Sequence, residues 1–338
     1  MRRISECAVV LVALLLAACG AEGGQSTSDG DAGKASLAGE KIDLVVPYEP
    51  GGGYDIYARL LAPYLEKCLD ATVVVKNEPG AGGLLAASKT FVAPPDSLRT
   101  VLTNTVGLVS AQLAEAEGAS FQAEKFSWLG RVSAEPNVLV VASDSKFGSF
   151  EDLLKATDEV RFVATGPGSN EYVNSTVLPE IYGFPAKTVT GFEGSDAARA
   201  AVLSGDADAH ILPLDSQMKA IKAGDVKPLL VIANEPHDAL ADVPTVADFP
   251  PRQGQEGTLD ALIKLSDTGR SLAGPPEMPP DQLAALREGL GCAIENEELL
   301  AKAEKQERDV DPLTGDETVK VVDEALGAPP EFTELIKE

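Results

Sequence analysis

The stretch that decides the fold, residues 43–69, reads "DLVVPYEPGGGYDIYARLLAPYLEKCL". A short apolar run stops at a proline, three glycines follow, and apolar residues at helical spacing begin at Tyr54. Pro63 lies inside this pattern and predicts a kink or an early break of the helix. A strand, a Gly-rich turn and a helix N-terminus in this order bring unpaired backbone N–H groups together, which predicts a site for an anion.

The same order of elements recurs along the chain. Strand-like runs such as "ATVVVKNEP", "RTVLTNT", "VRFVATG" and "VKPLLVIAN" alternate with helical patterns, and short turns join them. This alternation predicts the α/β class, with parallel sheets covered by helices on both faces. The 338 residues suffice for two lobes with cores of their own. We predict that residues 41–137 begin lobe 1, that 138–232 form lobe 2, and that 233–338 return to lobe 1 and end in helices.

The N-terminus is typical of an exported protein. Residues 1–18 combine a basic start with an apolar run too short to span a bilayer, and "LAACG" at 16–20 resembles the bacterial lipobox. We predict a lipoprotein signal peptide over 1–18, a lipidated Cys19 and a flexible tether over 19–40. The mature chain would be anchored by this lipid to the bacterial cell membrane, at the outer face or in the periplasm. The alternative is an ordinary signal peptide followed by a chance cysteine.

The predicted mature chain keeps only Cys68 and Cys292 besides the lipidated cysteine. An even pair of cysteines in an exported protein suggests one disulfide. The alternative is two buried free thiols, because spatial proximity cannot be read from the spacing.

The charge of the chain limits its partners. Lys and Arg number 28 against 53 Asp and Glu, which gives a formal net charge of −25. Such a surface repels nucleic acid and anionic lipid, so we exclude both and expect a monomer that touches the membrane only through its lipid. An anionic ligand would have to be held by helix dipoles and backbone N–H groups against the field of the whole protein.

Catalytic motifs are scarce in this sequence. It has two histidines, His210 and His237, neither at metal-ligand spacing to another His or Cys, and no signature of a hydrolase or metalloenzyme. We therefore predict no metal and no cofactor, and a structural or surface role for His210. Carboxylate catalysis needs no visible motif, so an enzyme would have to pair Asp55 with Glu193 or Asp215.

The turns that follow the strands are the candidate ligand site. They are rich in Gly, Ser, Thr and Asn, and in open α/β sheets ligands bind at the carboxyl ends of the strands. Each turn alone can also be ordinary turn chemistry, and the Gly-rich ones lack the P-loop lysine and the dinucleotide spacing. The predicted ligand-binding residues are Tyr48, Gly51, Gly52, Gly53, Tyr54, Asp55, Ala81, Gly82, Asn104, Thr105, Gly166, Gly168, Ser169, Asn170, Phe192 and Asp215.

Some of these residues have a structural alternative. Asp55 can cap the first helix or contact the ligand. Tyr48, Tyr54 and Tyr172 can line a cleft or pack in the interior. Arg59, one turn into the helix, is expected to form a structural ion pair.

The motifs together resemble a known family. "VVPYEPGGGYDIYAR", "VKNEPGAGG", "FSWLGRVSAEPNVLVVASDSKFGSFEDLL", "AVLSGDADA" and "DVPTVADF" occur in the order found in the Bug (TctC) family, the extracytoplasmic substrate-binding proteins of tripartite tricarboxylate transporters. The resemblance spans about residues 41 to 335. It implies a two-lobed periplasmic-binding-protein-like (Venus flytrap) fold in which the first turn and nearby backbone N–H groups hold a ligand carboxylate. Permease subunits of the membrane would be its partners.

The sequence departs from the family pattern at two positions that matter for the ligand. Tyr54 stands where the family has a small or hydroxylated residue, and it narrows or reshapes the cleft. Glu193 stands in the turn 191–194 of lobe 2, where a carboxylate would disfavour a carboxylate ligand unless it points away or recognises an amine or a hydroxyl.

The resemblance therefore predicts a lipid-anchored solute-binding protein that captures a di- or tricarboxylate or a related organic acid and performs no chemistry. The alternatives are an exported α/β enzyme acting on a small organic acid and a solute sensor that signals to a membrane kinase. A ligand recovered unchanged from the purified protein would favour binding over turnover.

Overall fold

The computed structural model describes residues 36–134, 136–167 and 169–337. The predicted signal peptide, Cys19, the tether up to residue 35 and Gly168 lie outside the described residues. Within them, no helix has both the length and the apolar character needed to cross a membrane.

Lobe 1 is built on a mixed sheet with the strand order β11-β4-β10-β3-β1-β2. Strands β1, β2 and β3 run parallel, whereas β10 pairs antiparallel with both β3 and β4. Its strands are β1 Lys41–Val46, β2 Thr72–Asn77, β3 Arg99–Asn104, β4 Ser127–Ser133, β10 Arg270–Gly274 and β11 Leu313–Thr314.

Lobe 2 is built on a second mixed sheet with the order β7-β6-β8-β5-β9. Strands β6, β7 and β8 are parallel, and β5 runs antiparallel to β8 and β9. Its strands are β5 Asn137–Ala142, β6 Val160–Val163, β7 Ala186–Val189, β8 Ala209–Pro213 and β9 Val226–Ile232.

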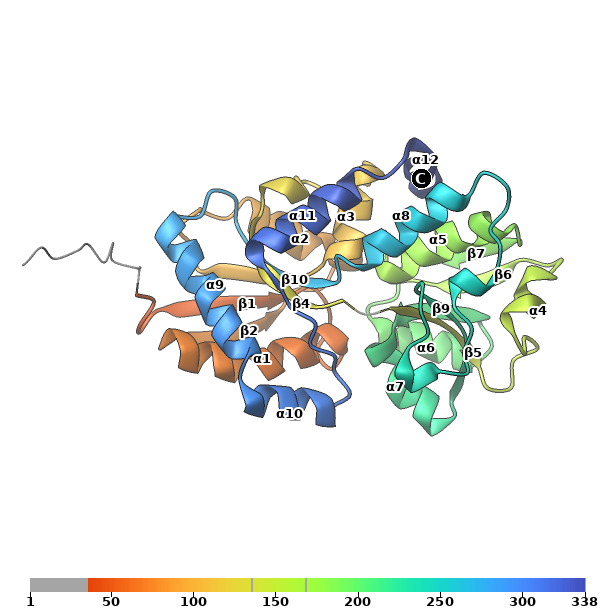
Figure 1. Ribbon diagram of the computed structural model, residues 1–338, viewed down its shortest axis with the longest axis horizontal. Coiled ribbons are helices and arrows are strands. Elements are labelled where there is room, and N and C mark those ends of the chain that lie inside the picture. Colours follow the sequence, from red (N-terminus) through yellow and green to blue (C-terminus); the bar gives the residue numbers. More distant parts are fainter. Residues whose placement is uncertain (1–35, 135, 168, 338) are drawn as a thin grey trace, which may run out of the picture. The chain divides into compact units, whose positions relative to one another are not determined.

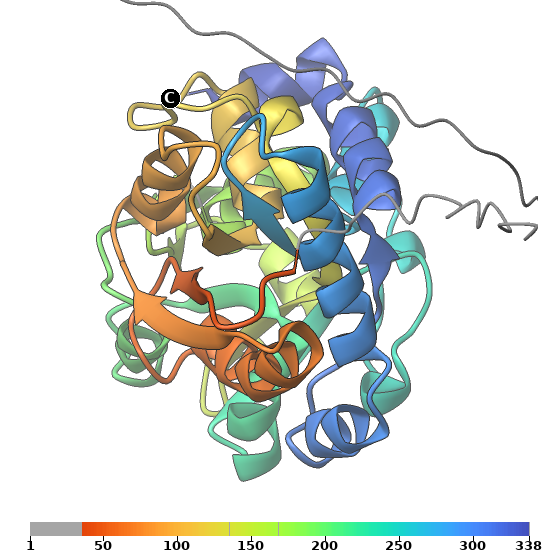
Figure 2. The same cartoon turned by 90° about the vertical axis from the view of Figure 1, so that its left-hand side faces the viewer.

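The helices cover these sheets and connect their strands (Figures 1 and 2). The helices of the first half are α1 Gly53–Leu69, η1 Ala81–Gly83, α2 Leu84–Phe91, α3 Thr105–Leu113, η2 Ala123–Lys125, α4 Phe150–Leu154, α5 Asn170–Tyr182 and α6 Ser195–Leu203. Those of the second half are α7 Leu214–Ala223, η3 Asp238–Leu240, η4 Val246–Asp248, α8 Glu256–Ser266, α9 Pro280–Ile294, α10 Glu297–Lys305, α11 Gly315–Leu326 and α12 Pro330–Ile336.

Alternation along the strands explains why helices cover both faces of the lobe 1 sheet. Leu44 and Val46 of β1 point to a core with Tyr57 and Leu61 of α1, whereas Val45 points to the opposite core. Successive side chains of a strand face opposite sides, so a run of apolar residues needs cover on both. The α/β class and the two-lobed fold predicted from the sequence are confirmed.

One hydrophobic core extends through both lobes. It joins residues of lobe 1 such as Val45 to residues of lobe 2 such as Phe162 and Val177. The C-terminal helix α12 contributes buried Phe332 and packs against α3, α5 and α8. After β9 the chain also stays beside the second sheet, because Thr245 bridges to Val231.

The structure corrects two local predictions. The sheets are mixed rather than parallel. In lobe 1, β4 and β10, which the strand pattern did not reveal, run antiparallel to their neighbours, and in lobe 2 β5 does so. Helix α1 continues through Pro63 to Leu69 without the early break that a proline favours. Leu60, Leu61 and Tyr64 around the proline are buried, so their packing offsets the lost backbone hydrogen bond.

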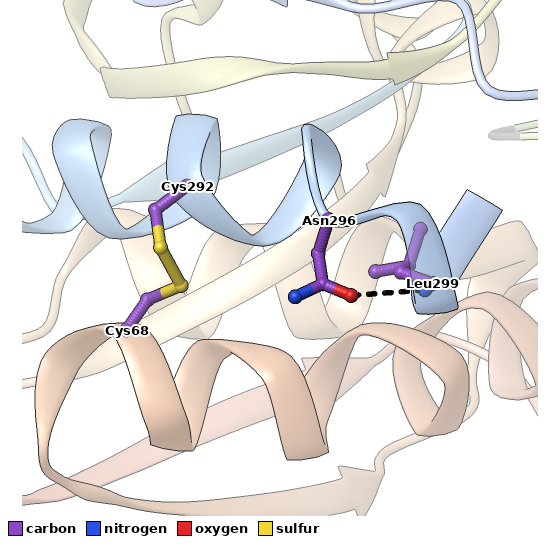
Figure 3. Close-up of a disulfide and its surroundings, with 4 residues drawn as sticks. All are labelled: Cys68, Cys292, Asn296 and Leu299. Carbon is purple, nitrogen blue, oxygen red and sulfur yellow. Dashed lines mark hydrogen bonds between the residues drawn. A yellow bond between two sulfur atoms is a disulfide. The ribbon is translucent and has the colours of Figure 1, made fainter.

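Cys68 and Cys292 form the predicted disulfide (Figure 3), with 6.1 Å between their Cα atoms. The bond joins α1 to α9 over a sequence separation of 224 residues. In the next helix, the side chain of Asn296 accepts a hydrogen bond from the Leu299 N–H and caps the start of α10. The disulfide therefore links the first helix of lobe 1 to α9, one of the helices at the C-terminal end of the chain.

Candidate functional site

A cavity of about 200 Å³ lies where turns from both lobes meet. It is formed by the turn between β1 and α1, the start of α5, and the turns that lead into α6 and α7. The residues that line it are Tyr48, Glu49, Pro50, Gly52, Gly53, Tyr54, Asn104, Asn170, Glu171, Glu193, Gly194, Ser195, Asp196, Ala197, Leu212, Pro213 and Ser216. None of these lining residues, all from the described part of the chain, is Lys, Arg or His.

Helices α1, α6 and α7 begin at this cavity without a side-chain cap. Their N-cap residues are Gly52, Gly194 and Pro213, which cannot supply a capping oxygen, and all three line the cavity. The first N–H groups of a helix have no partner within the helix, and the N-terminus carries about half a positive charge. The cavity thus has main-chain donors although no cationic side chain lines it.

Each of these helices carries an aspartate in its first turn that is held by an arginine. Asp55 contacts Arg59 at 2.8 Å, and Asp196 contacts Arg199 at 2.8 Å. Asp215, at the start of α7, is held in the same way by Arg270. The aspartates stabilise the helix starts, and the arginine pairs satisfy much of their charge, so the N–H groups stay available to a ligand.

The two lobes touch closely beside the cavity. A Cβ added to Gly53 would lie 2.5 Å from Ser216 Oγ, so the start of α1 has no room for a side chain against α7. A Cβ added to Gly166 would lie 3.0 Å from the Gly82 backbone N, which brings the β6–α5 loop against η1. Glycine at both positions permits this close approach of the lobes.

Tyr48 connects two of the predicted ligand turns. Its hydroxyl donates to the Gly82 carbonyl at 2.9 Å and accepts from Asn104 Nδ2 at 3.0 Å. Burial, together with the charge of Tyr54, raises the pKa of the Tyr48 hydroxyl well above its ordinary value, so it stays protonated at neutral pH. Its ring packs on that of Tyr54 with 4.9 Å between centroids.

A second cavity of about 480 Å³ adjoins the first. The two cavities share Tyr48, Glu49 and Glu193 as lining residues. The second cavity is otherwise lined by Pro79, Gly80, Ala81, Gly82, Thr165, Gly166, Pro167, Thr190, Gly191 and Phe192.

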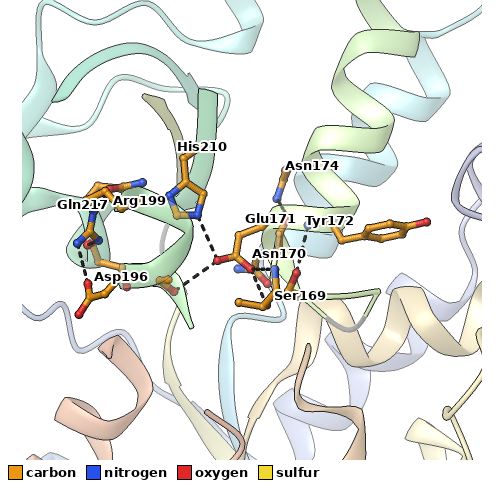
Figure 4. A network of polar contacts seen from close by, with 12 residues as sticks. Ser169, Asn170, Glu171, Tyr172, Asn174, Asp196, Arg199, His210 and Gln217 are labelled. Atoms are coloured by element: carbon orange, nitrogen blue, oxygen red, sulfur yellow. Dashed lines mark hydrogen bonds and ion pairs between the residues drawn. The ribbon is translucent and has the colours of Figure 1, made fainter. Parts of the chain in front are cut away.

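Glu171 and His210 form a buried pair in the wall of lobe 2 (Figure 4), with 3.2 Å between Glu171 Oε1 and His210 Nε2. Thr165 donates to the other carboxylate oxygen from its backbone N–H and from its hydroxyl. Burial opposes ionisation of Glu171, but the hydrogen bonds and charge of His210 and the donors of Thr165 prevail and lower its pKa. The carboxylate is thus satisfied by protein groups.

A second buried cluster lies behind the start of α1, between the lobes. Arg270 of β10 contacts Asp215 of α7 at 2.8 Å, and Arg308 contacts the other Asp215 oxygen at 2.7 Å. The Arg270 guanidinium carbon also lies 4.9 Å from the Tyr54 ring centroid and 4.7 Å from that of Tyr57. This cluster joins both lobes through charge and aromatic contact.

The structure brings many of the predicted ligand residues to the cavities. Those that line the main cavity are Tyr48, Gly52, Gly53, Tyr54, Asn104 and Asn170. Those that line the adjoining cavity are Tyr48, Ala81, Gly82, Gly166 and Phe192. Whether these residues bind a ligand stays a prediction.

Other predicted residues line neither cavity and have structural partners instead. Gly51 donates its N–H to Asp55, whose oxygens also accept from Arg59 and Asn77. Ser169 caps α5, and the Thr105 hydroxyl pairs with that of Thr103 at 2.8 Å. Asp215 is held in the arginine cluster. Tyr172 lines a separate surface pocket.

Sequence reasoning named the turn 191–194 and Asp215, but not the other residues at the starts of α6 and α7 that line the cavity, and it missed the Glu171–His210 pair. "GSDAA" and "PLDSQ" each place a small or proline residue before an acidic first turn, a pattern that indicates an uncapped helix start. Glu171 directly follows a predicted ligand residue, but its partner lies on another strand. In the described residues, no group of three or more His, Cys, Asp or Glu side chains is placed to hold a metal ion.

Comparison with known proteins gives consistent matches. Residues 57–317 match the family model described as "Tripartite tricarboxylate transporter family receptor". A UPF0065 protein from Pseudomonas sp. (strain P51) is 31% identical over 212 residues, which are 61% of this chain and 62% of that protein. The chain therefore matches less than two thirds of the length of this curated relative.

Solved structures share the fold at low identity. The periplasmic binding protein BugD superposes with a TM-score of 0.73 at 22% identity, covering 87% of this chain and 96% of BugD. MatC from Rhodopseudomonas palustris, solved with bound malate, gives a TM-score of 0.73 at 20% identity, covering 88% and 99%.

Proposed function

The chain belongs to the family of tripartite tricarboxylate transporter receptors, and we propose that it is an extracytoplasmic solute-binding protein that captures a small carboxylate. Members of this family are solute-binding proteins rather than enzymes. The observation that supports the proposal most is the convergence of the uncapped starts of α1, α6 and α7 on one cavity.

Main-chain donors suit an acidic protein. A net charge of −25 repels an anion at long range, but that field is screened beyond about 8 Å in physiological salt. At short range the backbone N–H groups at the helix N-termini would donate directly to the ligand. A carboxylate accepts several such bonds at once.

Capture follows from contacts made by both lobes. The cavity takes its walls from α1 in lobe 1 and from α5, α6 and α7 in lobe 2. A ligand that bridges these walls stabilises the closed arrangement of the lobes, and its higher affinity for that arrangement drives closure. The closed form would then be recognised by membrane permease subunits of the transporter.

The lipid anchor belongs to the same proposal. Its support is the lipobox-like "LAACG" at residues 16–20, which places Cys19 directly after small residues. Radiolabelled palmitate incorporated into the wild-type chain but not into a Cys19→Ala variant would establish it. The lobe ranges 41–137, 138–232 and 233–338 also stay a prediction.

The enzyme alternative needs a pair of carboxylates at the cavity, Asp55 with Glu193 or with Asp215, and the described residues do not bring such a pair to its lining. Asp55 and Asp215 line neither cavity, and arginines hold both.

Ligand binding is tested by titrating the purified mature protein with small acids. MatC shares the fold and was solved with malate, so malate and other dicarboxylates are the first probes, followed by tricarboxylates and aromatic acids. We expect at least one acid to raise the melting temperature and to be recovered unchanged. Chemical turnover of a bound acid would contradict the binding-protein proposal.

Gly52→Val tests whether the start of α1 takes part. Gly52 has a φ of −74°, and a Cβ there would meet only the Glu49 carbonyl at 3.8 Å, so the variant should fold. Its side chain would enter the cavity, and we expect affinity for the best acid to fall by about a hundredfold, roughly two lost main-chain hydrogen bonds. Gly257→Val in α8, where nothing lies within 4 Å of an added Cβ, is the control. Unchanged affinity in Gly52→Val would remove this turn from the site.

A further inference from the structure

Three consecutive charged residues of lobe 1, 307–309, touch lobe 2, and we call them the strap. They follow α10 in the chain. Glu307 pairs with Lys222 in the last turn of α7. Arg308 contacts Asp215, in the first turn of the same helix, at 2.7 Å. The strap therefore holds α7 near both of its ends.

The third contact of the strap reaches a different part of lobe 2. Asp309 Oδ2 lies 3.4 Å from Nε2 of His237, in the loop that follows β9. His237 is one of the two histidines of the chain, and this contact gives it a structural partner. Two separate elements of lobe 2 thus meet the strap.

The strap is fixed to lobe 1 by its backbone and by the residues that follow it. The Tyr57 hydroxyl of α1 donates to the Asp309 carbonyl at 2.7 Å. Val310 packs against the hydrophobic core between the lobe 1 sheet and α1, and Asp311 pairs with Arg131 of β4 at 2.8 Å. The charged side chains that contact lobe 2 are therefore carried by a segment anchored in lobe 1.

The strap acts on a helix that forms a wall of the main cavity. The strap residues, all within the described part of the chain, line neither cavity. Pro213 and Ser216 at the start of α7 line the main cavity, and Asp215 stands between them. Ser216 is also the residue that Gly53 of lobe 1 approaches. A motion that separates Gly53 from Ser216 would carry Asp215 away from Arg308, because a helix moves as one body.

We propose that the strap residues are positioning residues: they hold α7, and with it lobe 2, in the arrangement that forms the main cavity, without touching the ligand. This proposal rests on the proposed function, because it concerns the same cavity. A ligand that needs contacts from both lobes binds only molecules in this arrangement, so its apparent affinity is proportional to their fraction. The strap contacts thus raise the affinity for any ligand that spans the lobes.

The pair of Glu307 and Lys222 allows a charge-swap test, because both side chains are exposed and their replacement leaves the cores intact. Glu307→Lys should lower the affinity for malate about fivefold in calorimetry, since an attraction between the lobes becomes a repulsion. Lys222→Glu should do the same. The double variant restores the pair with its charges exchanged and should bring the affinity back to within about twofold of wild type. If another acid of the panel binds more tightly than malate, that acid is the probe.

Small-angle X-ray scattering of the ligand-free protein tests the strap without any acid. Glu307→Lys should increase the radius of gyration, because more molecules then have separated lobes, and the double variant should restore the wild-type value. Glu298→Lys is the matched control, since it reverses an exposed charge that is paired with Lys302 inside lobe 1. It should change neither the radius of gyration nor the affinity.

The outcomes separate the strap from the proposed function. If Glu307→Lys leaves the radius and the affinity unchanged, if it raises the affinity, or if the double variant restores neither, the strap does not position the lobes and carboxylate binding stands. A general folding defect would lower the melting temperature and would not be repaired by a second charge reversal. If no acid of the panel binds the wild-type protein but the scattering changes as expected, the proposed function fails and the effect of the strap on the lobes stands.

Discussion

The two buried carboxylates beside the cavity, Asp215 and Glu171, have opposite relations to the lobes. Asp215 belongs to lobe 2 but is held by Arg270 of lobe 1 and by Arg308 of the returning chain. Glu171 is held entirely by residues of lobe 2, Thr165 and His210 among them. The first cluster spans the junction of the lobes, and the second fixes the shape of one wall. Removing each charge should therefore have different consequences.

Asp215→Asn should have the largest effect. It leaves Arg270 and Arg308 buried with their main counter-charge removed, and breaking a buried pair in this way costs about 4 kcal/mol of unfolding free energy. Denaturant unfolding of the variant checks the magnitude. A loss below 1 kcal/mol would mean that water or another acceptor reaches the arginines, and the contrast with Glu171 would disappear.

Glu171→Gln should cost less, about 2 kcal/mol, because the amide keeps the shape and can still accept from Thr165. The loss should be confined to lobe 2. Hydrogen exchange should show faster opening at the start of α5, with protection around α1 unchanged. Equal loosening of both lobes would contradict a role of Glu171 confined to lobe 2.

The free energy of unfolding of the same variant, relative to wild type, should also depend on pH, with a smaller change whose direction can be predicted. The pKa of Glu171 is lowered from its usual value of 4.5, so its contribution is fully present above pH 4.5 and is lost as pH falls through the lower folded value. The stability difference between wild type and Glu171→Gln should thus shrink as the pH falls below 4.5. A difference that grows on acidification would show that burial, which raises the pKa, prevails over His210 and Thr165.

Asp196→Asn should have the smallest effect. Asp196 also sits in a first turn with an arginine partner, but its side chain is 80% exposed, so the pair with Arg199 is worth less than about 1 kcal/mol. The same denaturant experiment measures it. A loss comparable to that of Asp215→Asn would mean that burial is not what separates the clusters.

Prediction from sequence succeeded where the signal is local. The run of "DLVVPYEPGGGYD" gives the strand, the turn and the helix start, and Gly52, Gly53 and Tyr54 line the cavity. Prediction failed for contacts between residues that lie far apart in the sequence. The Glu171–His210 pair joins residues 39 positions apart, and Asp215 meets Arg270 across 55. Sequence periodicity carries no trace of such long-range contacts, so it could not show that arginines engage both oxygens of Asp215.

The position of β4 in its sheet also depends on residues that are remote in the sequence. "FSWLGRVS" carries a glycine and an arginine that obscure its strand character, yet as β4 it lies between β10 and β11 with every residue buried. Its place in the sheet is decided by chain segments more than a hundred residues away.

The uncapped helix starts give the cavity a property that side chains cannot provide. A backbone N–H has no proton to lose at physiological pH and no side chain that a point mutation could replace. Outside the cell, where acidity varies, such donors keep their protons, whereas a histidine-based site changes its charge near neutral pH. In the proposed site the acid group is bound by backbone N–H groups, so substitutions at residues such as Glu193 and Tyr54 would change which ligand fits without removing these donors.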